Sequence, residues 1–360
     1  MKIKKYLIIT LILSVIMPVV IIYKNNYSPA YAAGGTSSEI LIERDSLRVL
    51  SKFNEKEKRG IASTTKILTA LCVIKNSDLK KVVEISDEMV GIEGSSVYLL
   101  KGEKYTVEQL LFGLMLRSGN DAATALAIST SGSVSAFVKL MNDTARSLNA
   151  LDSNFANPHG LDDDKHYSTA YDLAIITASA MKDPTFKTIV DSEYYSFEKI
   201  GTGEKVVWTN KNKLLKKDES FNGVKTGFTK KCGRCLVAAK EEGGMQLISV
   251  VLNVGPMFER CEDLLDQGFK DYSLYKILDS SSEYARLKTG KTVKSELCVS
   301  VRDDVYYPLT VSEYNGLDYK FVPNSVDFKK DKICGSVGKI DVYLQNRLIY
   351  SAESFIIIPH

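Results

Sequence analysis

The order of the predicted elements constrains this fold most, because strand signals lie on both sides of a long helical block. Residues 106–190 are rich in Ala and Leu and predict mostly helix, interrupted at 157–160. A further helix is predicted over 264–275. The predicted strands lie at 40–42, 47–50, 234–240 and 246–252. This strand–helix–strand order predicts an α/β (α+β) domain over residues 35–275, in which helices flank a sheet.

A second, smaller domain is predicted after a polar stretch at residues 280–283. Residues 339–344 and 347–350 alternate apolar and polar side chains on either side of Gln345-Asn346, which predicts a hairpin. We therefore expect a β-rich domain over residues 280–360. A chain of 360 residues is long enough for one large domain with its own core and this smaller one.

The first 32 residues have the layout of an export signal. Lysines at positions 2, 4 and 5 precede an apolar run over 6–23, and the small-x-small triplet Ala30-Tyr31-Ala32 follows. We expect an exported protein cleaved after Ala32; an uncleaved membrane anchor is the alternative, because the run of 18 residues is long enough to span a bilayer. Residues 1–32 hold four lysines and no acid, so their removal lowers the formal charge from +3 to −1. A near-neutral mature chain argues against nucleic acid as a partner.

The histidines and cysteines do not predict a metal site. The chain has three histidines and six cysteines, and only the spacing of Cys232 and Cys235 suits a zinc or redox site. Cys232 and Cys235 form a C-x-x-C pair, but the sequence contains no second such pair to complete a zinc site. We interpret the cysteines as small buried hydrophobic residues, and we expect no metal and no cofactor.

Three short motifs occur in order along the chain: Ser63-Thr-Thr-Lys66, Ser118-Gly-Asn120 and Lys225-Thr-Gly227. None of them is specific alone, because similar strings occur elsewhere. S-x-x-K also begins at Ser77, Ser179, Ser196, Ser273 and Ser336, S-x-N at Ser147 and Ser220, and K-T-G at Lys288. The physical context of each motif therefore has to choose among them.

Ser63 stands at the start of a strongly apolar predicted helix, whereas Ser77 lies in a polar turn. A nucleophile at a helix start gains from the positive potential there. Spacing of three residues places Lys66 on the same helix face, close enough to take the hydroxyl proton. Lys66 is a base near neutral pH only if its pKa falls, through desolvation or through a second lysine nearby. The alternative is an N-capping serine beside a surface lysine.

The other two motifs also have a chemical and a plain interpretation. Ser118 and Asn120 lie in a polar turn between two apolar helical segments, which is costly unless the turn lines a cavity. A hydroxyl and an amide there can relay a proton and hold a substrate amide; a helix cap is the alternative. Lys225-Thr226-Gly227 runs into a predicted strand, where Gly227 permits close approach of a ligand backbone and Lys225 supplies a cation. A hairpin turn is the alternative at this motif.

Together the three motifs are the signature of penicillin-binding proteins and class A β-lactamases. Over residues 35–275 the chain resembles the low-molecular-mass penicillin-binding proteins, the serine-type D-alanyl-D-alanine carboxypeptidases, and its tail is similar to their C-terminal domain. The matching segments are Ala62–Ala70, Lys101–Val107, Leu116–Ala122, Asn157–Leu161, His166–Ala170, Gly223–Thr229 and Leu264–Phe269. The resemblance implies a β-lactamase/transpeptidase-like fold: an antiparallel sheet flanked by helices, a helical subdomain and a small all-β C-terminal domain.

The resemblance also implies the reaction. Ser63 would be acylated by the penultimate D-Ala of a peptidoglycan stem pentapeptide, releasing the terminal D-Ala, and water would then free the enzyme. Lys66 would be the general base, and Ser118 would pass a proton to the leaving amine. β-Lactam antibiotics would acylate the same serine and act as inhibitors.

The remaining motif residues would bind the substrate. By the resemblance, Asn120 orients the substrate or the base, and Lys225 with Thr226 holds the substrate carboxylate. Gly227 precedes Phe228, whose backbone N–H would share the oxyanion hole with the N–H of Ser63.

Two alternatives and three departures accompany the resemblance. A β-lactamase of the same fold is one alternative, although the E-x-x-L-N string of class A enzymes does not occur. A β-lactam sensor or wall-binding module without turnover is the other, although only one N-terminal apolar run is visible. Cys232 stands where many relatives have a small non-thiol residue, and Arg260 is the candidate for the family's carboxylate-binding arginine. An amphipathic C-terminal anchor helix is not visible, so membrane association would come through the N-terminal segment.

Overall fold

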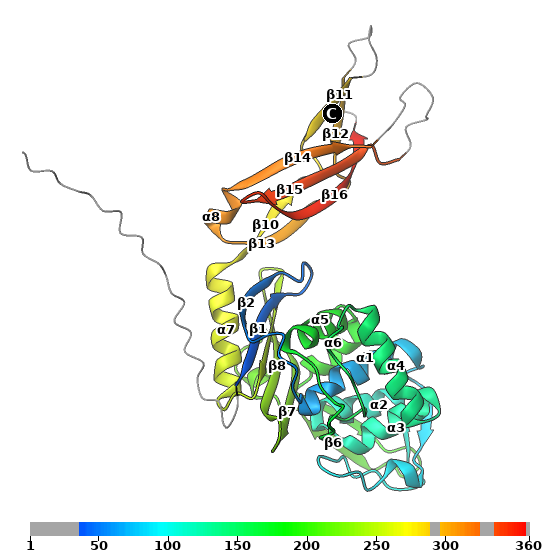
Figure 1. Cartoon of the computed structure of the whole chain (residues 1–360). Helices are drawn as coiled ribbons and strands as arrows, with labels where there is room; N and C mark the ends of the chain where they lie inside the picture. Colours follow the sequence, from blue (N-terminus) through cyan, green and yellow to red (C-terminus); the bar gives the residue numbers. More distant parts are fainter. Residues whose placement is uncertain (1–35, 289–295, 325–334, 358–360) are drawn as a thin grey trace, which may run out of the picture.

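The computed structural model describes residues 36–288, 296–324 and 335–357, and Figure 1 shows a larger α/β part and a smaller β part joined through one helix. The predicted export signal at 1–32 lies outside the described residues, as do Cys334, His360 and Thr289-Gly290 of the second K-T-G string. The larger part runs to Asp271, and the β part begins with Ser273.

A five-stranded antiparallel sheet forms the centre of the larger part, in the order β2-β1-β9-β8-β7. Its strands are β1 (Ser38–Glu43), β2 (Val49–Phe53), β7 (Phe221–Thr229), β8 (Gly233–Glu242) and β9 (Met245–Leu252). The N-terminal strand β1 pairs directly with β9, so strands from both sides of the helical block share one sheet. The strand β7 lies at an edge of this sheet.

Helices cover both faces of the sheet, because its side chains alternate between two cores. Leu41 and Leu247 pack with α7 (Met257–Asp271) on one face, and their neighbours Ile40 and Ile248 pack with the helical block on the other. The predicted helix at 264–275 was only partly right. Pro256 fixes an earlier start for α7, and the chain is already extended from Ser273 in β10 (Ser273–Leu278).

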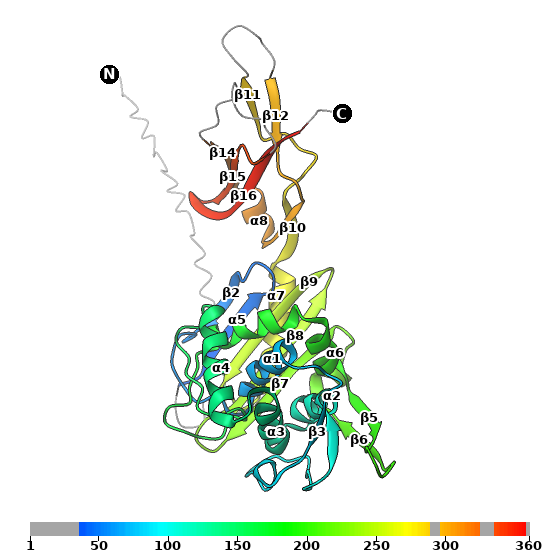
Figure 2. The same ribbon diagram turned by 90° about the vertical axis from the view of Figure 1, so that its right-hand side faces the viewer.

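The helical block contains α1 (Lys66–Asn76), α2 (Val107–Phe112), α3 (Asn120–Ser131), α4 (Val134–Ser147), α5 (Ala170–Met181) and α6 (Pro184–Asp191). Figure 2 shows α1 in the middle of these helices, and its first eight residues are all buried. Two small hairpins border the block: β3 (Val82–Glu84) with β4 (Lys104–Thr106), and β5 (Tyr194–Glu198) with β6 (Lys205–Thr209).

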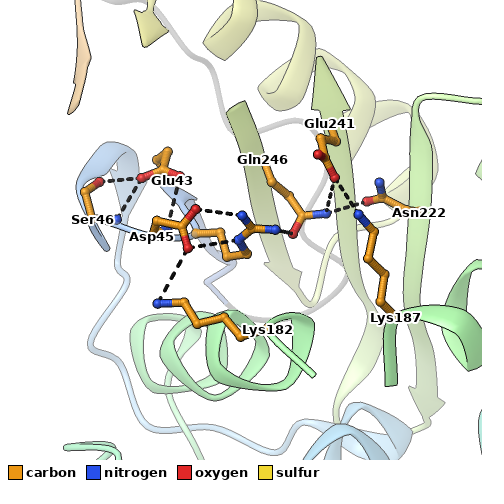
Figure 3. A network of polar contacts seen from close by, with 9 residues as sticks. Glu43, Asp45, Ser46, Lys182, Lys187, Asn222, Glu241 and Gln246 are labelled. Atoms are coloured by element: carbon orange, nitrogen blue, oxygen red, sulfur yellow. Dashed lines mark hydrogen bonds and ion pairs between the residues drawn. The ribbon is translucent and has the colours of Figure 1, made fainter. Parts of the chain in front are cut away.

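A network of polar contacts ties the β1–β2 turn to the sheet and to α5 (Figure 3). Arg44 donates to the side-chain oxygen of Gln246 at 2.9 Å and pairs with Asp45 at 2.6 Å. Asp45 also faces Lys182, at 3.6 Å, while the Gln246 amide donates to Asn222 at 3.0 Å. The network therefore connects β1, β9 and the first residues of β7 at one end of the sheet.

The smaller part is built almost entirely of strands. One sheet has the order β11-β12-β16-β15-β14, and β10 pairs separately with β13. The strands are β11 (Ala285–Lys288), β12 (Glu296–Ser300), β13 (Val305–Leu309), β14 (Leu317–Pro323), β15 (Gly338–Leu344) and β16 (Arg347–Ile357), with one short helix, α8 (Val311–Tyr314). The predicted hairpin around Gln345-Asn346 is confirmed as β15 and β16.

Arg48, just before β2, connects the two parts. Its guanidinium donates to the carbonyl of Pro308 and pairs with Glu313 at 2.6 Å. It also lies over the rings of Tyr272 and Tyr307, at 5.2 and 5.5 Å from their centroids. One side chain thus joins the β1–β2 hairpin to α8, β13 and the end of α7.

Within the described ranges, no single helix is long and apolar enough to cross a membrane; α3 and α4 pass such a test only as a pair bent by 85°. The same residues contain no group of three or more His, Cys, Asp or Glu side chains placed to hold a metal ion.

Candidate active site

The start of α1 is held in an unusual conformation that presents Ser63. A short 3-10 helix, η1 (Ala62–Thr65), leads into α1, and Ala62 has a positive φ of 48°. Gly160 packs against this turn so closely that an added Cβ would lie 1.9 Å from the Ala62 carbonyl oxygen. Thr65 donates to the same carbonyl at 2.8 Å. Ser63 is half-buried, so part of the residue remains accessible to solvent.

His166 supports this turn from below. The backbone N–H of Ala156 donates to His166 Nδ1 at 3.1 Å, so the proton of the neutral ring is on Nε2. Nε2 lies 2.8 Å from Thr65 Oγ1, which completes a chain of hydrogen bonds from the ring to the Ala62 carbonyl. Burial lowers the pKa of His166 to about 4, which keeps the ring neutral near pH 7.

Lys66 is completely buried and points at the nucleophile. Its Nζ lies 3.1 Å from Ser63 Oγ, 2.7 Å from Asn120 Oδ1 and 2.6 Å from the carbonyl oxygen of His159. The amine is therefore fixed by two acceptors with its remaining position directed at the serine hydroxyl. This is the geometry that a base needs in order to take a proton from Ser63.

Electrostatics favours the neutral amine of Lys66. Desolvation lowers its pKa well below the ordinary lysine value, and the charges of Lys225 and Lys211 lower it further, while Asp121 opposes them. Lys225 is also buried, and desolvation followed by the charge of Lys211 brings its pKa to about 7. A cluster of lysines with one nearby carboxylate thus favours the unprotonated form of Lys66.

Ser118 and Asn120 follow a π-helical turn, η3 (Gly113–Arg117), that extends α2. Ser118 has a left-handed conformation with a φ of 64°, and its hydroxyl has no hydrogen-bond partner among the residues that the structure describes. Asn120 begins α3, and its side-chain N–H donates to the carbonyl of Glu93 at 2.6 Å. The amide oxygen of Asn120 is thereby turned toward Lys66.

The third motif lies inside β7, so the alternative of a hairpin turn is wrong. Gly227 faces η1, and a Cβ there would lie 3.1 Å from the backbone nitrogen of Ser63. Lys225 points into the helical side and donates to the carbonyl of Thr226 at 3.0 Å, and Thr226 itself is partly exposed. Phe228 follows with a 61% exposed ring that pairs with Arg234. The edge strand β7 therefore lies directly beside the turn that carries Ser63.

The structure brings the three sequence motifs together around Ser63, whereas Arg260 lies away from them. Arg260 is on α7, on the far face of the sheet, where it pairs with the buried Glu39 at 2.6 Å. The cysteines that the structure describes are buried, as expected for small core residues. Cys232 packs against Gly60, next to the turn that carries Ser63, and burial raises the pKa of its thiol.

Sequence reasoning missed three contributors to the site. Lys211 follows the β5–β6 hairpin and affects both buried lysines, yet nothing in its local sequence distinguishes it from other exposed lysines. The carbonyls of His159 and Glu93 hold Lys66 and Asn120. A backbone carbonyl cannot be recognised from residue type. Only the interruption of the helical pattern at 157–160 pointed to the carbonyl of His159.

Comparison with known proteins identifies the family. The family of D-alanyl-D-alanine carboxypeptidases, peptidase family S11, matches residues 25–255. D-alanyl-D-alanine carboxypeptidase DacF of Bacillus subtilis is 32% identical over 310 residues, which cover 84% of this chain and 78% of the relative. DacA of Escherichia coli K12 is 33% identical over 322 residues, covering 83% of this chain and 78% of that protein.

Solved structures agree with the sequence relatives. Penicillin binding protein 5 of Haemophilus influenzae superposes with a TM-score of 0.74 at 27% identity, over 89% of this chain and 96% of that one. A variant of the Streptomyces K15 DD-transpeptidase gives a TM-score of 0.62 at 33% identity, over 65% of this chain and 97% of that one. The predicted fold class is therefore confirmed, and the chain belongs to the S11 family of serine peptidases, the D-alanyl-D-alanine carboxypeptidases.

Proposed function

We propose that this chain removes the terminal D-Ala from peptidoglycan stem peptides through an acyl-enzyme on Ser63. The observation that carries the proposal is the buried, pKa-lowered amine of Lys66, 3.1 Å from Ser63 Oγ, in a chain of the carboxypeptidase family. A serine hydroxyl is a weak nucleophile until a base takes its proton, and Lys66 is placed to do so.

The acylation step uses the cleft residues in turn. As Ser63 Oγ bonds to the carbonyl carbon of the penultimate D-Ala, its proton passes to Lys66 Nζ. The backbone N–H groups of Ser63 and Phe228 stabilise the negative oxygen of the tetrahedral intermediate. A proton then reaches the leaving nitrogen through the Ser118 hydroxyl, the C–N bond breaks, and D-Ala departs, leaving an ester.

Deacylation repeats the cycle with water. Lys66 takes a proton from the water that attacks the ester, and the oxygen of Ser63 regains its proton as the ester bond breaks. Lys225 and Thr226, on β7, hold the carboxylate of the terminal D-Ala during acylation, and Asn120 keeps the base in place. Penicillins carry a carboxylate and a reactive amide carbonyl, and they acylate Ser63 by the same path.

The N-terminal segment completes the proposal. The basic start, apolar run and Ala30-Tyr-Ala32 triplet support export across the cytoplasmic membrane, where stem peptides are accessible. Residues 35–275 are proposed as the catalytic domain, and residues 280–360 as a separate β domain. Membrane association, if cleavage does not occur, would come through residues 6–23.

The test measures D-Ala release from a peptide ending in D-Ala-D-Ala. We expect Ser63→Ala to reduce release by at least about 10⁴-fold, because the nucleophile is lost. Ser77→Ala is the matched control: Ser77 begins another S-x-x-K string but ends α1 and contacts Thr130, so release should be unchanged. Penicillin turnover at many per second without D-Ala release would instead identify a β-lactamase. Acylation by penicillin without peptide cleavage would identify a sensor.

A further inference from the structure

We infer that Asp121 is a positioning residue of this site: it anchors the segment 93–99, which in turn holds Asn120 in the orientation that faces Lys66. The inference rests on the proposed role of Lys66 as the base. Neither the family match nor the three sequence motifs assigns a role to Asp121.

The carboxylate of Asp121 gathers hydrogen bonds from one short segment. Asp121 is 1% exposed and lies in the first turn of α3. Its oxygens accept from the Ser96 hydroxyl at 2.5 Å, from the Val97 N–H at 3.0 and 3.1 Å, and from the Leu99 N–H at 3.1 Å. Asp121 Oδ1 also accepts from the N–H of Ala122 at 2.9 Å. All of these partners are hydrogen-bond donors, so only a side chain that accepts through both oxygens satisfies them all.

The anchored segment holds Asn120 from two sides. The backbone N–H of Asn120 donates to the carbonyl of Ser95 at 2.7 Å, and its side-chain N–H donates to the carbonyl of Glu93 at 2.6 Å. Gly94 lets the amide approach, since an added Cβ would lie 2.9 Å from Asn120 Nδ2. With its nitrogen fixed in this way, the amide can offer only its oxygen to Lys66.

Asp121 also acts on Lys66 through its charge. The charged and titratable groups that face Lys66 are Lys225 on β7, Lys211 after β6, His159 and His166 on the loop between α4 and α5, and Asp121 on α3. Of these only Asp121 is negative, and it raises the pKa of Lys66 against the two lysines. A variant that removes the charge should therefore reveal itself in the pH dependence of acylation as well as in its rate.

The direct test is Asp121→Asn, with the second-order rate constant of acylation by a fluorescent penicillin measured against pH. At the plateau of the pH profile we expect the rate constant of acylation to fall by about 10²-fold, the usual cost of a displaced catalytic group. The base must be neutral to work, so the rate rises as pH passes the pKa of Lys66. Loss of the carboxylate lowers that pKa. The acid limb, the part of the profile in which the rate rises with pH, should therefore move to lower pH.

A matched control separates positioning from general loss of a buried carboxylate. Asp172 is 2% exposed in the first turn of α5 and likewise accepts from a loop, at 2.8 Å from the Asp152 N–H and 2.7 Å from the Ser153 hydroxyl. It does not act on Lys66. Asp172→Asn should leave both the plateau and the acid limb as in the unmodified protein.

Ser96→Ala keeps the test decisive if Asp121→Asn does not fold. It removes one donor to Asp121 but keeps the charge, so the plateau should fall less and the acid limb should stay in place. The inference is overturned if Asp121→Asn folds and its acid limb does not move, or if Ser96→Ala acylates like the unmodified protein. Failure of the proposed function would look different, because the unmodified protein would then release no D-Ala from the peptide, whatever the acylation rates of Asp121→Asn and Ser96→Ala.

Discussion

At the scale of single residues, the site depends on keeping an amine neutral. Two lysines near Ser63, Lys66 and Lys225, are buried. Among the groups that shift the pKa of Lys66, the only carboxylate is that of Asp121. Burying two like charges together is costly, so the cluster favours the state in which Lys66 has lost its proton. A neutral amine beside a serine hydroxyl can then serve as the base without any histidine.

Lys225→Ala tests this electrostatic account. Removing the positive charge of Lys225 raises the pKa of Lys66, so the acid limb of penicillin acylation should move to higher pH. This shift is opposite to the one expected for Asp121→Asn. Substrate binding should weaken as well, because the carboxylate loses its cation. Lys216→Ala, on the exposed surface after β6, is the control and should leave the profile unchanged.

An unmoved acid limb in Lys225→Ala would assign the low pKa of Lys66 to desolvation alone.

The surroundings of Lys66 also show how much of the site the sequence could predict. The S-x-x-K spacing and the apolar helix singled out Ser63 and Lys66 correctly as neighbours. The sequence could not show that Lys211 and two backbone carbonyls complete the surroundings of the site, because those contacts depend on how distant loops fold over α1.

At the scale of elements, the β5–β6 hairpin braces the turn that carries Ser118. Trp208 packs on η3, where a Cβ on Gly113 would lie 3.0 Å from its ring, and Tyr195 stacks on Phe112 with centroids 3.7 Å apart. The N–H of Lys211 then donates to the carbonyl of Leu116 at 3.2 Å. The hairpin thus fixes the π-helical turn and places Lys211 near the buried lysines.

Trp208→Ala should therefore affect stability and chemistry together. We expect a loss of about 3–5 kcal/mol in the free energy of unfolding, as for other large-to-small core changes. Acylation should slow by at least about 10-fold, because the Ser118 turn is no longer held. Val207→Ala, 56% exposed on the outer face of the same strand, is the control and should change neither. A destabilised Trp208→Ala protein with normal acylation would contradict the claim that the β5–β6 hairpin holds the turn that carries Ser118.

Element boundaries show where the sequence was informative. The alternation of β15 and β16 and their turn residues predicted that hairpin correctly, because the pattern is local. The left-handed residues Ala62 and Ser118 were not predictable, since neither is a residue type that favours positive φ. Their conformations are imposed by contacts such as Gly160 on the Ala62 carbonyl, which only the folded chain supplies.

At the scale of the whole molecule, the site lies in the larger part and the β part stands beyond the C-terminal end of α7 (Figure 1). Arg48 is the charged contact between them, reaching Pro308 and Glu313 from the β1–β2 hairpin. The separation predicts that the β part takes no part in the chemistry at Ser63.

Arg48→Ala tests this arrangement. Loss of the charged hydrogen bonds should cost about 2 kcal/mol in the free energy of unfolding and loosen the two parts, seen as a larger radius of gyration in X-ray scattering. Penicillin acylation should be unchanged, because the cleft does not include Arg48. Lys52→Ala, which breaks an exposed ion pair of the same hairpin, should cost no more than about 0.5 kcal/mol. Slowed acylation in Arg48→Ala would contradict the separation.

The central claim is that Ser63 becomes covalently acylated while Lys66 serves as its base. Intact-protein mass spectrometry after brief exposure to penicillin, followed by peptide mapping, measures this directly. We expect one adduct of the whole penicillin mass, on the peptide that contains Ser63, forming quickly in the unmodified protein. The adduct should be absent in Ser63→Ala and should form far more slowly in Lys66→Met. An adduct on any other residue, or equal acylation of Ser63→Ala, would contradict the account.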